Sequence, residues 1–134
     1  MAHVISFHSA RFDVVNETPN SINPLFGESV LRWLREKLDA SGYETNAPAP
    51  EDWGWYIDAK GPGVAYLVGA SGEAAEDGTG RVDWTIQIDK HRSLKEKLTG
   101  ANTLAADDRL SALIERLVRE DGGAAEVEVD RAGP

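Results

Sequence analysis

The segment RVDWTIQID, residues 81–89, alternates apolar and polar side chains from Val82 onward. A period of two is typical of a β-strand with one buried face and one polar face. The apolar set is Val82, Trp84, Ile86 and Ile88, and the polar set is Asp83, Thr85, Gln87 and Asp89. We therefore predict an antiparallel sheet with a core on one side only.

Two strands are expected to precede this segment. Lys60-Gly61-Pro62-Gly63 has the composition of a tight turn, so residues 51–58 and 64–68 are predicted to form a hairpin. The glycine-rich residues 71–80 follow it, and we expect them to form the most mobile loop of the chain.

The first strand of this hairpin is expected to have two different faces. Trp53, Trp55 and Ile57 are predicted to share the buried face, because side chains two residues apart point the same way in a strand. Tyr56 and Asp58 then lie on the opposite face, together with the polar side chains of residues 81–89.

A helix is expected before these strands. Asn23-Pro24 is typical of a helix start, because asparagine suits the N-cap and proline suits the first helical position. The helix is predicted to run to about Ala40, and Gly42 suits its C-terminal end.

Two more helices are expected after the strands. Ser93 and Glu96 have the spacing of a capping box, which predicts a short helix that ends at Gly100. Asp107 or Asp108 is predicted to cap the last helix. The apolar side chains of that helix repeat at helical spacing: Leu110, Leu113, Ile114, Leu117 and Val118.

The remaining strands are expected near the two ends of the chain. A strand is predicted from Val4 to Phe7 or as far as Val14, and a short one over residues 43–45. The last segment alternates Ala125, Val127 and Val129 with Glu126, Glu128 and Asp130. Its charges suit a sheet edge or an exposed face.

These elements predict one α+β domain over residues 1–134. The order β-α-β-β-β-α-α-β favours two layers, a mostly antiparallel sheet with helices packed on one face.

Composition narrows the function classes. The chain has 134 residues, 41% of them hydrophobic, and no cysteine, which excludes thiol catalysis and cysteine-ligated zinc. Neither a signal peptide nor a membrane-spanning run is recognisable, so a cytoplasmic protein is expected. The net charge of −9 makes nucleic acid an unexpected partner. The same charge is consistent with simple solubility or with inhibition of a basic partner.

Motifs for catalysis, metals and cofactors are missing. No G-x-S-x-G, phosphate-loop or calcium-loop pattern occurs. His3 is expected in a frayed terminus, and His3 and His8, five residues apart, are expected on opposite faces of one strand. We therefore predict no catalytic residue, no metal site and no cofactor.

Two surfaces are candidates for binding. The first is the polar face of the sheet, where an aromatic side chain accompanies short polar ones: Tyr56, Asp58, Asp83, Thr85 and Gln87. The alternatives for this face are a merely solvated surface or a pair of carboxylates that act as general acid and base. The second is a basic cluster at the start of the short helix, where backbone N–H groups favour an anion: Lys90, His91, Arg92 and Lys95. The alternative for this cluster is a set of surface ion pairs.

Three segments carry a resemblance: NPLFG at residues 23–27, EDWGWY at residues 51–56 and HRSLK at residues 91–95. Together they resemble a family of small uncharacterised bacterial cytosolic proteins. The resemblance implies a bacterial, cytosolic origin and carries over neither an activity nor site residues.

Two functions remain as expectations. The first is a non-enzymatic binding protein, of the adaptor or immunity-inhibitor type, that engages a protein partner through its sheet face or its acidic surface. The second is a small-molecule anion-binding protein or minor enzyme with a site near residues 90–95. A homodimer through a terminal edge strand stays open.

Overall fold

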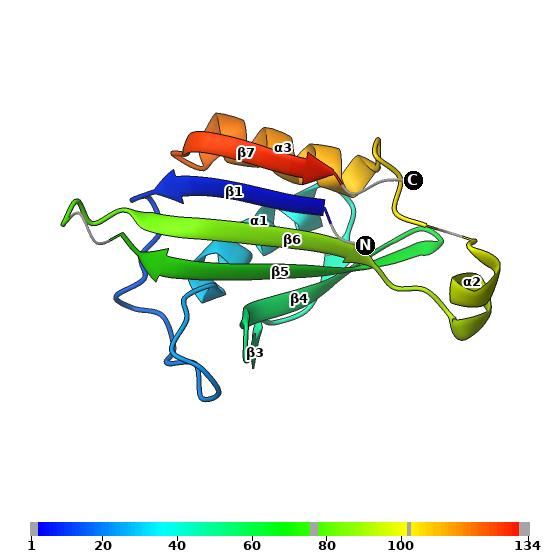
Figure 1. Ribbon diagram of the computed structural model, residues 1–134, viewed down its shortest axis with the longest axis horizontal. Helices are drawn as coiled ribbons and strands as arrows, with labels where there is room; N and C mark the ends of the chain where they lie inside the picture. The colour runs from blue at the N-terminus through cyan, green and yellow to red at the C-terminus, as the bar shows by residue number, and fades with distance from the viewer. Residues whose placement is uncertain (1–2, 76–77, 102, 132–134) are drawn as a thin grey trace.

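One antiparallel sheet organises the chain, and two helices cover one of its faces (Figure 1). The computed structural model describes residues 3–75, 78–101 and 103–131. Within these residues the sheet has seven strands, and its order is β2-β4-β5-β6-β1-β7, with β3 paired to β4. The α+β class and the mostly antiparallel sheet predicted from the sequence are confirmed.

The strands are β1 (His3–Ser9), β2 (Glu44–Thr45), β3 (Ala49–Glu51), β4 (Gly54–Gly61), β5 (Val64–Ala74), β6 (Val82–Lys90) and β7 (Ala125–Arg131). The helices are α1 (Glu28–Ala40), α2 (Leu94–Thr99) and α3 (Arg109–Asp121).

The core lies between the sheet and the helices α1 and α3. The apolar side chains of β6 are all buried, as their alternation predicted. Trp84 is the largest of them, and Phe12 packs edge-on against its ring with 5.8 Å between centroids. Burial of each such side chain stabilises the fold by roughly 1.5–3 kcal/mol.

β1 is shorter than the longest extent predicted for it. It ends at Ser9, and the chain then turns so that Phe12 enters the core beside Trp33, with 5.2 Å between the ring centroids. Continuation to Val14 was therefore wrong, because packing of Phe12 under the helix layer takes the backbone out of the sheet.

The predicted start of α1 was also wrong. The helix begins at Glu28 rather than at Asn23-Pro24, and its N-cap residue is Gly27. The Glu17 carboxylate accepts hydrogen bonds from the backbone N–H groups of Gly27, Glu28 and Ser29, so it satisfies donors that a helix start leaves free.

Asn23 has a different role in this loop. Its side chain donates to the backbone oxygen of Asp52 instead of capping the helix. The backbone of Phe26 pairs in both directions with that of Gly72 on β5, which fixes the approach to α1 against the sheet.

α2 stands apart from the helix layer (Figure 1). Its capping box forms as predicted: Ser93 accepts from the Glu96 N–H, and Glu96 accepts from the Ser93 N–H. None of its six side chains is buried, and Leu94 and Leu98 are 74% and 78% exposed. The helix therefore has a capped first turn, and none of its side chains enters the core.

Two predictions about the hairpin region need correction. Trp53 does not share the buried face with Trp55 and Ile57, because it precedes β4 and is separated from it by Gly54, whose φ is +145°. Residues 71–74 of the predicted mobile loop belong to β5. Glu76 and Asp77 lie outside the described residues.

A buried hydrogen-bonded chain joins β1, α3 and β5. The Tyr66 hydroxyl donates to Asp108 Oδ1 at 2.7 Å, and Ser111 donates to Asp108 Oδ2 from both its N–H and its hydroxyl. His3 Nδ1 lies 2.8 Å from Ser111 Oγ, and the His3 side chain is not frayed but only 1% exposed. Asp108, not Asp107, is therefore the cap of α3.

The hydrogen bonds of this network define which groups donate and which accept. Because the Ser111 hydroxyl donates to Asp108, His3 donates to Ser111 from Nδ1. Burial and the hydrogen bond to Asp108 raise the pKa of Tyr66, so the phenol stays a donor.

Burial lowers the pKa of His3 below its ordinary value of 6.5. As pH falls through that value, the unfolded chain binds the proton before the folded one, so the free energy of unfolding is expected to decrease from pH 7.5 to 5.5. Urea denaturation at the two pH values measures the decrease, and His3→Gln is expected to reduce it. An equal decrease in wild type and variant would contradict this role.

Candidate binding surface

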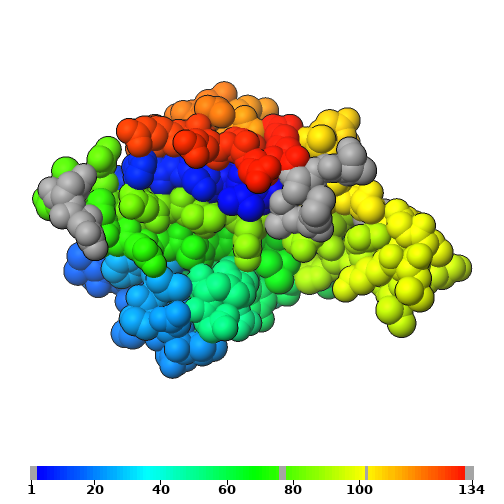
Figure 2. Space-filling model, in the orientation of Figure 1, coloured from blue at the N-terminus to red at the C-terminus, as the bar shows by residue number. Residues whose placement is uncertain are grey.

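The face of the sheet opposite α1 and α3 is open, and Figure 2 shows it from the front. No described element lies across its centre. The register places Tyr56 beside Gly69 and Gly69 beside Gln87, while Asp58 lies beside Leu67. Asp83 and Thr85 lie on the same face of β6 as Gln87. The structure thus places all five residues that the sequence proposed for a sheet-face site on one face, with Asp58 and Asp83 toward opposite ends of it.

Trp53 joins this face, although the sequence placed it in the core. Its indole covers Gly69 so closely that a Cβ atom there would lie 2.5 Å from the ring. Its ring centroid is 6.5 Å from that of Tyr56. The one sequence signal was Gly69 itself, since a glycine within a strand marks a close approach by another group.

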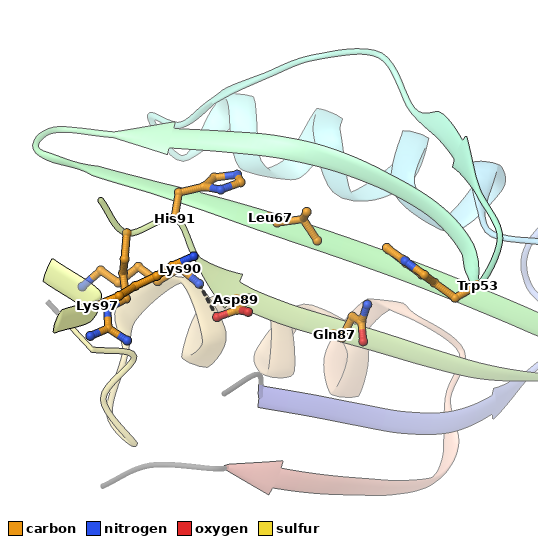
Figure 3. Close-up of a pocket in the computed structure, with 8 residues that line it drawn as sticks. Trp53, Leu67, Gln87, Asp89, Lys90, His91 and Lys97 are labelled. Atoms are coloured by element: carbon orange, nitrogen blue, oxygen red, sulfur yellow. Dashed lines mark hydrogen bonds between the residues drawn. The ribbon is translucent and has the colours of Figure 1, made fainter. Parts of the chain in front are cut away.

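A groove of about 440 Å³ runs from Trp53 toward α2 (Figure 3). Leu67 lies on its floor between Trp53 and His91, and Gln87 and Asp89 form the side along β6. The other lining residues are Lys90, Arg92 and Lys97. The groove therefore combines the indole of Trp53, the imidazole of His91 and the side chain of Leu67 with charged groups of both signs.

His91 connects the two surfaces that the sequence treated separately. Its backbone N–H donates to the oxygen of Ala65, the second residue of β5. Its Nε2 lies 3.0 Å from Asp58 Oδ1 on β4. The imidazole thus extends across the first residues of β5 to β4. The polar sheet face and the basic cluster are therefore parts of one continuous surface.

The basic cluster does not converge on a single point. Arg92 donates to the backbone oxygens of Glu96 and Ala101, so it holds the C-terminal end of α2. Lys90 and His91 line the groove, as does Lys97, which the sequence did not single out; Lys95 does not. The capping box also uses N–H groups that were expected to receive an anion.

Six carboxylates lie on the same face of the sheet as these aromatic residues. They come from four strands and are Asp58, Glu73, Asp83, Asp89, Glu128 and Asp130. His8 lies between two acidic side chains, paired with Asp83 through Nδ1 and with Glu126 through Nε2, the latter at 2.9 Å. The open face is therefore predominantly acidic.

Neither a metal-binding cluster nor a membrane-spanning helix is present among the described residues. They contain no group of three His, Asp or Glu side chains placed to hold a metal ion. Among their helices, none is long and apolar enough to cross a membrane.

No family model, curated protein or solved structure matches this chain. The bacterial family resemblance therefore stays a prediction, and the function is argued from the surface alone.

Proposed function

We propose that this protein is a non-enzymatic binding protein, of the adaptor or inhibitor type, that engages a basic protein partner through its open sheet face. The observation that carries the proposal is the Trp53–Tyr56 pair, which lies on an uncovered sheet face that also bears six carboxylates.

Trp53 and Tyr56 have the properties of interface anchors. Aromatic side chains contribute a large contact area and are enriched among the residues that dominate binding energy. Trp53 is held against Gly69, so little side-chain entropy remains to be lost when a partner covers it. Leu67 in the adjoining groove extends the apolar part of the surface.

The charge on this face favours a basic partner. The six carboxylates belong to a chain whose net charge is −9, and such a field accelerates encounter with a positively charged protein. This attraction is screened by salt. Binding is therefore expected to weaken as ionic strength rises.

An anion site near residues 90–95 has less support. Arg92 is engaged with the end of α2, and His91 is paired with Asp58. A rise in melting temperature with phosphate, lost in Lys97→Ala, would nevertheless move the assignment to that alternative.

The test is affinity capture from a lysate of the source organism, with mass spectrometry of the bound proteins. Wild type is expected to retain one dominant basic protein. Tyr56→Ala and Gln87→Arg should each reduce its retention by about 30-fold, the effect of losing roughly 2 kcal/mol at a central interface residue.

The control is Glu36→Lys, which changes charge on the exposed side of α1 and should keep the partner. Melting curves establish that all variants fold. Capture that survives both sheet-face substitutions would exclude this face as the binding surface.

A further inference from the structure

The two edges of the sheet differ. Along one edge lie β2 and β3, which have only two and three residues; Pro48 lies between them, and Pro50 lies within β3. The other edge is β7, which has seven residues without proline or glycine. Among the described strands β7 pairs with β1 only, so its second side carries no neighbouring strand (Figure 1).

The free side of β7 can accept another strand. In an edge strand every second residue directs its N–H and C=O groups away from the sheet. An extended segment of a partner pairs with such groups, and its side chains then continue both faces of the sheet.

The side chains of β7 indicate which segment fits. Glu128 and Asp130 lie opposite Ser6 and Val4 on the open face, and Val127 and Val129 are half-buried. A strand with lysine or arginine at alternate positions would place each cation beside a carboxylate. Apolar residues at the positions between would continue the row of valines.

A second copy of this chain is a poor occupant. Antiparallel pairing of two β7 strands about Glu128, which lies in the regular part of the strand, would place the two Glu128 side chains opposite each other. Like charges directly opposite each other destabilise a strand pair. The edge thus opposes self-association and favours a basic strand.

We propose that the free edge of β7 pairs with an extended segment of the partner in which basic and apolar residues alternate. This inference rests on the proposed function, since it names the part of the basic partner that extends the sheet. The added strand would continue the acidic open face outward from β7.

The experiment uses a synthetic nine-residue peptide that alternates lysine and valine, and a matched peptide with glutamate in place of lysine. Hydrogen exchange of the full chain is measured with each. The lysine peptide is expected to protect backbone amides of β7, and the glutamate peptide is not. Peptide binding without protection of β7, or equal binding of both peptides, would overturn the inference.

Charge reversal on β7 gives the second measurement. The double variant Glu128→Lys with Asp130→Lys is expected to bind the lysine peptide about tenfold more weakly, which corresponds to two cross-strand pairs reversed in sign. The control is the double variant Glu36→Lys with Glu120→Lys, which changes the net charge by the same amount but on the helix layer. This control should bind the lysine peptide as tightly as wild type does. Equal affinity of both double variants would overturn the inference.

Failure of this inference is distinguishable from failure of the proposed function. Suppose that Tyr56→Ala no longer captures the natural partner while the β7 double variant still does. That result overturns the strand pairing and supports the sheet-face function. Self-association of the wild type with protection of β7 assigns the edge to a second copy and also overturns the inference.

Discussion

Replacement of Gly54 by alanine is expected to lower the free energy of unfolding by about 3 to 5 kcal/mol. Two separate costs combine. Gly54 has a φ of +145°, which a residue with a Cβ atom rarely adopts. A Cβ atom would also lie 2.4 Å from the backbone oxygen of Ala70 in the buried strand β5. Because that oxygen belongs to the sheet backbone, it cannot move away as a side chain would.

Gly63→Ala is the matched control. Its φ is +70°, but no atom lies within 4 Å of the position of the new Cβ. Only the backbone strain applies, and the expected loss is about 1 kcal/mol. Urea denaturation of both variants separates the strain from the clash, and equal losses would show that the contact with Ala70 is readily relieved.

Replacement of Asp108 by alanine is expected to cost about 2 to 4 kcal/mol. The substitution removes the N-cap of α3 and leaves the Tyr66 hydroxyl without its acceptor. Ser111 also loses the acceptor of its hydroxyl, so the hydrogen-bonded chain to His3 ends there. The free energy of unfolding from urea denaturation measures this loss.

Asp107 provides the comparison for Asp108. It is the preceding residue, carries the same charge and is exposed. Asp107→Ala is expected to change stability by less than about 0.5 kcal/mol. Equal effects at the two positions would mean that net charge near the helix start, rather than the buried hydrogen bonds, stabilises this end of α3.

The elements that the sequence predicted well are those determined locally. The alternation of residues 81–89 reports one buried face directly, and Ser93 and Glu96 form their capping box within a single helical turn. The start of α1 failed because its capping carboxylate comes from Glu17, ten residues before the helix N-cap Gly27. Nothing in the local pattern at Asn23-Pro24 reveals a competing cap.

The candidate surface could be predicted only where it depends on local strand alternation, and not where it depends on contacts distant in the sequence. Strand alternation placed Tyr56, Asp58 and Gln87 on one face, and the register agrees. The groove could not be predicted from the sequence, because it depends on the contact of His91 with Asp58, 33 residues away. It also depends on the position of Trp53, which precedes β4 and is separated from it by the backbone turn at Gly54. A change of backbone direction at one glycine moves that aromatic ring from the core to the surface.

The independence of α2 has a consequence for how sequences of this fold can diverge. Since none of its side chains is buried, substitutions at Leu94 or Leu98 are expected to change the free energy of unfolding very little. Lys97 on the same helix nevertheless lines the groove. Substitutions along α2 are therefore expected to change the contacts that the groove offers while the free energy of unfolding stays nearly the same.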